Sequence, residues 1–103
     1  MINATIYGII MSQKEKLIAR FMKKPTPNDI TFEEFCSVMA EFCFQAQNMN
    51  GGSHQRFKNT KYPDFRMDAV PKPHGNNNCV KRPYVENAQA AITEFKRRED
   101  ENE

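Results

Sequence analysis

The chain contains only two histidines, and one of them, His54, lies in the polar, glycine-led segment NGGSHQRFKN at positions 50–59. Arg56 and Lys58 follow it at alternate positions. Alternate residues of an extended strand share a face, so the imidazole and the two cations are expected on one face. Histidine can take or give a proton near neutral pH, and cations stabilise the charge of a phosphate under attack. The pattern therefore suits phosphodiester chemistry, although an ordinary hairpin with a solvated face would present the same side chains.

Basic residues are concentrated between Gly52 and Tyr84. This third of the chain carries seven lysines and arginines against two aspartates, a net charge of +5, whereas the whole chain carries +2. Such a localised basic zone indicates contacts with phosphate groups. The candidates for binding the phosphates of a nucleic acid within it are Arg56, Lys58, Arg66, Lys72, Lys81 and Arg82. The last two stand at a predicted helix start, where free backbone N–H groups also favour anions.

Two capping boxes predict the helices that precede this zone. Ser12 with Glu15 begins a helix that the prolines at 25 and 27 must end. Thr31 with Glu34 begins a second helix, in which apolar residues recur every three or four positions up to Cys43. This stripe needs a sheet or another helix to cover it.

After Cys43 the hydrophobic period changes from helical to two, which predicts strands. Asn50-Gly51 is a strong hairpin signal because both central residues of the turn must accept positive φ. The second strand, 52–58, should direct Ser53, Gln55 and Phe57 toward the helices. A turn around residues 62–64 leads to a third strand at 65–70.

In the third strand, Phe65, Met67 and Ala69 are expected to face inward. Arg66 and Asp68 would then lie beside His54 on the open face. Asp68 could orient the imidazole only if the two strands pair at that register.

A final helix is expected from about Pro83 to Arg98, because proline suits the first helical position and apolar residues follow at helical spacing. The predicted fold class is α+β: a two-layer sandwich with the helices on one side of a three-stranded antiparallel meander. This helix–three strands–helix kernel, with an extra N-terminal helix, has the order of the double-stranded-RNA-binding domain. We expect one domain over 1–103, with an accessory extension at 1–11, a folded part at 12–98 and a solvated acidic tail at 99–103.

The three cysteines, Cys36, Cys43 and Cys79, form an odd set without a C-x-x-C pair. This favours a reducing compartment, and we predict a cytoplasmic protein. The spacing of the first two suits core positions of a helix rather than zinc ligands, so no metal or other cofactor is expected. The apolar run INATIYGII is short and lacks a basic leader, and we therefore expect neither a signal peptide nor a membrane span.

Three segments in order resemble the HicA-type mRNA interferase toxins of bacterial and archaeal toxin–antitoxin systems. They are KP…ITFEEF before and within the second helix, GGSHQRF in the hairpin, and VPKPHG followed by VKRPYV at the last helix. The resemblance covers about residues 16 to 95, and the long segment before Lys16 departs from many short members of that family. It implies a double-stranded-RNA-binding-like fold and a stress-response endoribonuclease that cleaves mRNA. It further implies that a HicB-type antitoxin covers the site, with neither DNA contact by this chain alone nor a membrane.

The resemblance assigns the catalytic role to His54 through the Gly-Ser-His motif. RNA supplies its own nucleophile, the 2′-hydroxyl, so cleavage needs a base, an acid and cations but no metal. Candidate accessory residues are Ser53, Asp68 and His74, of which His74 lies between Pro73 and Gly75 and could equally be structural. Two other functions remain open: a non-catalytic RNA-binding module and a domain that binds an acidic protein.

Overall fold

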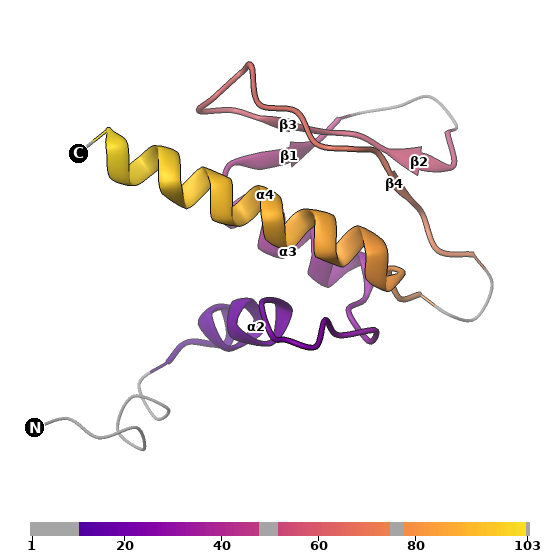
Figure 1. The fold of residues 1–103 in the computed structure, drawn as a ribbon. Coiled ribbons are helices and arrows are strands. Elements are labelled where there is room, and N and C mark those ends of the chain that lie inside the picture. The colour runs from indigo at the N-terminus through magenta and orange to yellow at the C-terminus, as the bar shows by residue number, and fades with distance from the viewer. Residues whose placement is uncertain (1–10, 48–51, 75–77, 103) are drawn as a thin grey trace, which may run out of the picture.

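The computed structural model describes residues 11–47, 52–74 and 78–102, and this part of the chain has an α+β fold (Figure 1). Its helices are α2 (Gln13–Phe21), α3 (Phe32–Glu41) and α4 (Arg82–Glu101). Its strands are β1 (Phe44–Ala46), β2 (His54–Gln55), β3 (Phe57–Asn59) and β4 (Val70–Pro71). No helix in these ranges is both long and apolar enough to span a membrane.

Both predicted capping boxes are confirmed. The Ser12 hydroxyl accepts a hydrogen bond from the Glu15 backbone N–H at 3.0 Å, and the Glu15 carboxylate accepts one from the Ser12 N–H at 3.1 Å. Thr31 and Glu34 make the same reciprocal pair at 3.1 and 3.0 Å. Each pair satisfies two backbone donors that a helix start would otherwise leave open, which fixes where α2 and α3 begin.

The core lies between the helices and one face of the strands. The Phe35 ring of α3 contacts Phe57 of β3 with ring centroids 5.6 Å apart. The Phe44 ring of β1 contacts Phe95 of α4 at 6.3 Å. Because these phenylalanines are buried while their strand neighbours are exposed, one face of the strands is covered by α3 and α4 and the other is open.

The strands form two antiparallel pairs rather than the predicted three-stranded meander. β1 pairs with β3, placing Gln45 opposite Lys58, and β2 pairs with β4, placing His54 opposite Pro71. An isolated bridge joins Lys58 to Arg66. The predicted hairpin turn at Asn50-Gly51 lies outside the described residues.

The predicted third strand is interrupted because the two facing segments differ in length by one residue between their bridges. Between the pair Gln55–Val70 and the pair Lys58–Arg66 lie residues 56–57 on one side and residues 67–69 on the other. One residue in excess prevents a continuous ladder, as in a β-bulge.

The start of α4 is fixed against the start of α3. Thr31 and Cys79 form an antiparallel bridge. On either side of it, Phe32 N–H donates to Asn78 O at 2.9 Å and Val80 N–H donates to Ile30 O at 2.8 Å. This pairing brings the residues just before α4 to the end of the molecule where α3 begins.

The last helix is longer than predicted. α4 continues to Glu101, and Glu99 accepts hydrogen bonds from Lys61 Nζ at 2.7 Å and from the Tyr62 hydroxyl at 2.5 Å. Part of the predicted acidic tail is therefore folded against the turn after β3. Of the predicted extension at 1–11, residues 1–10 lie outside the described part.

Candidate nucleic-acid interface

His54 is exposed on β2, as predicted, whereas Gln55 and Phe57 are buried. The buried Gln55 holds this part of the chain in place, because its Nε2 donates to Gln47 O at 2.6 Å and to Arg56 O at 3.0 Å. A buried carboxamide with satisfied donors stabilises one backbone arrangement. It therefore fixes the backbone of Arg56 relative to Gln47, which follows β1.

The Ser53 hydroxyl lies 3.1 Å from His54 Nδ1, so the two side chains are hydrogen-bonded. This corrects the expectation that Ser53 faces the core. Ser53 is exposed at a bend before β2, so the strict alternation of a strand does not extend to it. With Nδ1 engaged, Nε2 is the ring nitrogen left to meet a substrate.

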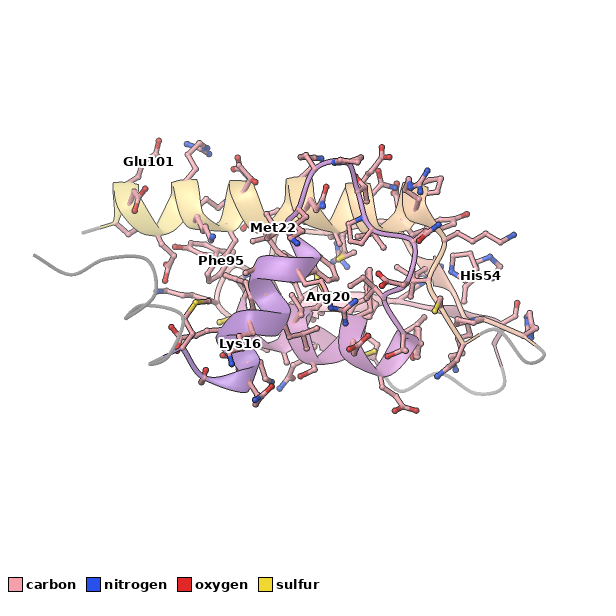
Figure 2. All side chains as sticks on the ribbon, turned by 90° about the horizontal axis from the view of Figure 1, so that it is seen from below. Lys16, Arg20, Met22, His54, Phe95 and Glu101 are labelled. Atoms are coloured by element: carbon pink, nitrogen blue, oxygen red, sulfur yellow. The ribbon has the colours of Figure 1, made fainter. Side chains whose placement is uncertain are left out.

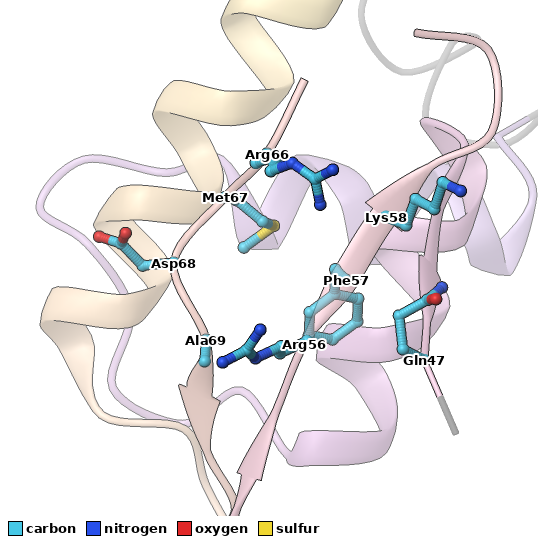
Figure 3. Close-up of a pocket in the computed structure, with 8 residues that line it drawn as sticks. All are labelled: Gln47, Arg56, Phe57, Lys58, Arg66, Met67, Asp68 and Ala69. Carbon is cyan, nitrogen blue, oxygen red and sulfur yellow. The ribbon is translucent and has the colours of Figure 1, made fainter. Parts of the chain in front are cut away.

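Three cations line a cleft of about 470 Å³ between β3 and residues 66–69, which we call the cation cleft. They are Arg56, Lys58 and Arg66. Figure 3 shows the guanidinium groups of Arg56 and Arg66 directed into the space between the two strands. Within the described residues none of the three forms an ion pair with a carboxylate.

The cleft exists because the ladder opens between Gln55–Val70 and Lys58–Arg66, where the one-residue excess occurs. Phe57 and Met67 line it together with the cations. A single difference in strand length therefore creates a basic cleft on the open face.

Asp68 is not beside His54, which corrects the predicted arrangement. His54 pairs with Pro71, whereas Arg66 pairs with Lys58, four residues further along. The Asp68 carboxylate points away from both guanidinium groups (Figure 3), and Asp68 also lines a groove shared with Glu94 of α4. No described contact connects Asp68 to the imidazole, so it cannot orient the ring in this register.

A second basic cluster lines a pocket of about 280 Å³ beside the start of α4, which we call the α4 pocket. Its lining residues are Pro71, Lys72, Pro73, His74, Cys79, Lys81 and Tyr84. Three predicted site residues, Lys72, His74 and Lys81, are thus brought together.

His54 adjoins the α4 pocket through Pro71, its ladder partner. Residues directly opposite each other in an antiparallel pair point to the same face. In addition, Lys72 N–H donates to Ser53 O at 2.8 Å. Figure 2 accordingly shows His54 at the end of the molecule where α4 begins, far from Glu101.

Arg82 lies apart from this pocket lining. Its Nε donates to Thr26 O at 3.0 Å, which ties the start of α4 to the loop after α2. Arg82 remains exposed, but its position is set by a structural contact.

Sequence reasoning missed Tyr84 as a site residue, because its helical spacing assigned it to the core. It is half-buried and lines the α4 pocket. Its place two residues after the basic pair Lys81-Arg82, in the sequence Lys-Arg-Pro-Tyr, was the available signal.

Cys36 is not a reactive alternative to His54. Burial raises the pKa of the Cys36 thiol, with the nearby Lys72 ammonium opposing the shift, and a protonated thiol is a poor nucleophile and metal ligand. In the described ranges no group of three histidine, cysteine or acidic side chains could hold a metal ion.

The arrangement is an exposed imidazole between two basic concavities, the cation cleft along the strand and the α4 pocket across the ladder. Such an arrangement can bind a phosphodiester on either side of a proton-transfer group. Comparison of the chain with protein-family models, curated proteins and solved structures gave no match.

Proposed function

We propose that this protein is a metal-independent endoribonuclease of the HicA type, an mRNA interferase whose catalytic residue is His54. The observation that carries the proposal is the exposed His54 imidazole, whose Nδ1 is hydrogen-bonded to Ser53. Cations two and four residues away form no ion pair within the described residues. Support also comes from the Gly-Ser-His, Pro-Lys-Pro-His and Lys-Arg-Pro-Tyr motifs, whose order matches that family.

In the proposed reaction, His54 Nε2 removes the proton from a ribose 2′-hydroxyl. The 2′-oxygen then forms a bond to the adjacent phosphorus, and the bond from phosphorus to the 5′-oxygen of the next nucleotide breaks. That 5′-oxygen takes a proton from water, since no second titratable side chain in the described residues contacts His54. The products are a 2′,3′-cyclic phosphate and a 5′-hydroxyl.

The cations of the cation cleft stabilise the reacting phosphate and hold its neighbours. Arg56 and Arg66 direct planar guanidinium groups into one space, and such groups pair well with phosphate oxygens. Because these cations have no carboxylate partner in the described part of the chain, RNA binding does not first have to break an ion pair.

The proposal includes a double-stranded-RNA-binding-like fold. The order α3, strands, α4 agrees with the double-stranded-RNA-binding-like kernel of the HicA family. We propose that a HicB-type antitoxin covers the open face, because a partner with an acidic surface would neutralise the same cations that hold RNA.

A second function is favoured by the absence of a described acid–base partner for His54. A non-catalytic RNA-binding module would use the cation cleft and the α4 pocket for phosphates and would need no second titratable group.

The test compares the wild-type chain with His54→Ala and a control, Lys23→Met, after induction in a bacterial host. Growth and message integrity are followed, and purified proteins are incubated with RNA in the presence of a metal chelator. We expect RNA loss with wild type and the control but not with His54→Ala. Equal RNA loss with His54→Ala, or a 5′-phosphate product, would refute the proposed mechanism.

If neither wild type nor His54→Ala cleaves RNA but both bind it, the second function is correct. If neither binds RNA, the basic zone instead serves a protein partner.

A further inference from the structure

The α4 pocket has a small volume and a lining that contains both ring-shaped and basic side chains. Pro71, Pro73 and the half-buried Tyr84 are among its lining residues, and their rings can supply apolar walls. The volume of about 280 Å³ lies just below the range of about 300–1,000 Å³ for small-molecule sites, which leaves room for a single base but not for a larger ligand. Bases of single-stranded RNA stack on aromatic side chains, and such contacts tolerate any base.

The polar side chains of the pocket are mainly hydrogen-bond donors. Lys72 and Lys81 donate and cannot accept, while the Tyr84 hydroxyl and the His74 ring can do either. Among the described lining residues no side chain carries a carboxylate or a carboxamide. The pocket therefore offers more hydrogen-bond partners to the acceptor atoms of a base than to its amino groups.

The four RNA bases differ in the acceptor and donor groups on their edges. Guanine and uracil present a carbonyl oxygen at the position where adenine and cytosine present an amino group. Lysine is a common partner of guanine O6 and N7. A donor-rich lining consequently favours guanine and uracil.

The pocket also lies beside the proposed catalytic residue. Its wall residue Pro71 is the ladder partner of His54, and Lys72 N–H is bonded to Ser53 O. We infer that the α4 pocket holds the nucleobase next to the cleaved phosphodiester and selects guanine or uracil over adenine or cytosine. This inference rests on the proposed function, because it names the part of the RNA that the same site recognises.

The first test measures binding without cleavage. The nucleoside 3′,5′-bisphosphates of the four bases carry one base and two phosphates and contain no internucleotide bond to cut. Titrations of the full chain, followed by NMR at the Tyr84 ring and the backbone of residues 71–74, should give affinities for guanosine and uridine at least about fivefold higher than for adenosine and cytidine. Equal affinities for the four bases would overturn the inference.

Variants separate stacking from base selection. Tyr84→Leu should weaken binding of all four bisphosphates by about tenfold. The double variant Lys72→Met/Lys81→Met should bring the ratio of the affinities for the two base classes close to one. This result does not depend on how Tyr84 packs. Lys23→Met replaces an exposed lysine two residues after α2 and is the matched control. It should change neither the affinities nor the ratio between the two base classes.

The second test sequences the ends produced from a random RNA pool. Wild type should leave guanine or uracil enriched at one position beside the cut, and the double lysine variant should lose that enrichment. Cleavage without base enrichment, together with equal bisphosphate affinities, overturns the base pocket and leaves the nuclease intact. Selective bisphosphate binding without any RNA cleavage overturns the nuclease and leaves the base pocket intact.

Discussion

Gln89 Nε2 of α4 donates a hydrogen bond of 2.9 Å to the backbone oxygen of Phe21, the last residue of α2. The same nitrogen donates to Lys23 O at 3.1 Å, and Gln89 Oε1 accepts from Lys24 Nζ at 2.6 Å and from Thr26 Oγ1 at 3.3 Å. Gln89 is only 3% exposed. One carboxamide therefore attaches α2 and the loop after it to α4, the helix that begins at the candidate site.

Gln89→Ala should lower the free energy of unfolding by about 2–3 kcal/mol, because the buried carbonyl of Phe21 loses its donor. Urea unfolding measures the change. Asn87→Ala, at an exposed position of the same helix, is the control and should stay within about 0.5 kcal/mol of wild type. A loss of unfolding free energy as small as that of the control would show that water replaces the carboxamide.

Asn59→Ala should also destabilise the fold, by about 2–3 kcal/mol. Asn59 is fully buried. Its Nδ2 donates to Phe42 O at 3.1 Å, and its Oδ1 accepts from the backbone N–H groups of Lys61 and Tyr62 at 3.0 and 2.8 Å. The substitution leaves these backbone groups without partners at the turn that leads to Arg66. Thr60→Ala, at the exposed neighbouring position, is the control, and an equal effect of both would contradict the role of Asn59.

Stability should fall as the pH falls below about 4.5, because several glutamates have lowered pKa values in the folded chain. Contacts with Arg97 and then Arg98 lower the pKa of Glu94 to about 2 from its ordinary value of 4.5. The hydrogen bond from the Lys61 ammonium, followed by that from the Tyr62 hydroxyl, lowers the pKa of Glu99. A carboxylate whose pKa is lowered by folding adds stability above 4.5, and this contribution disappears as the pH falls through the folded value.

The measurement is the urea midpoint between pH 6 and pH 2. Glu94→Gln should flatten the decline between pH 4.5 and 2, since the variant has no carboxylate to protonate there. Glu86→Gln, at an exposed position of α4 without a described ion pair, is the control. Identical profiles for Glu94→Gln and wild type would contradict the assignment.

Local signals in the sequence predicted the local structure well. The capping boxes at Ser12 and Thr31 place the helix starts, because each needs only residues three positions apart. Strand alternation placed His54 outside and Phe57 inside, since the side-chain period of a strand is fixed at two.

Pairing between distant segments could not be predicted in the same way. The one additional residue between the two bridges moves the ladder partner of His54 from Val70 to Pro71, and the hydrophobic pattern of residues 65–70 does not reveal this residue. The same extra residue creates the cation cleft. Gln89 was missed because a polar residue on a buried helix face is understood only when its partners are known.

Ser53→Ala should lower kcat for RNA cleavage by about two- to tenfold and leave KM unchanged. The Ser53 hydroxyl is hydrogen-bonded to Nδ1 of the imidazole. Ser53 is therefore a positioning residue that sets the orientation of the ring and does not bind RNA. Its effect is modest because both residues are exposed and water can replace the hydroxyl. Ser53→Thr keeps a hydroxyl and should restore most of kcat. A rise in KM with constant kcat would instead assign Ser53 to RNA binding.

Arg56→Gln and Arg66→Gln should each reduce the salt dependence of RNA binding. Neutralising one phosphate contact releases one fewer counterion, so the slope of log K against log salt concentration should fall in magnitude by about 0.7 for single-stranded RNA. The measurement uses the His54→Ala background, in which the proposed mechanism allows no cleavage, and titrates labelled RNA at several salt concentrations. Lys23→Met, remote in sequence from the cleft, should leave the slope unchanged. An unchanged slope in both arginine variants would mean that the cation cleft does not hold the RNA backbone, even though both guanidinium groups point into it.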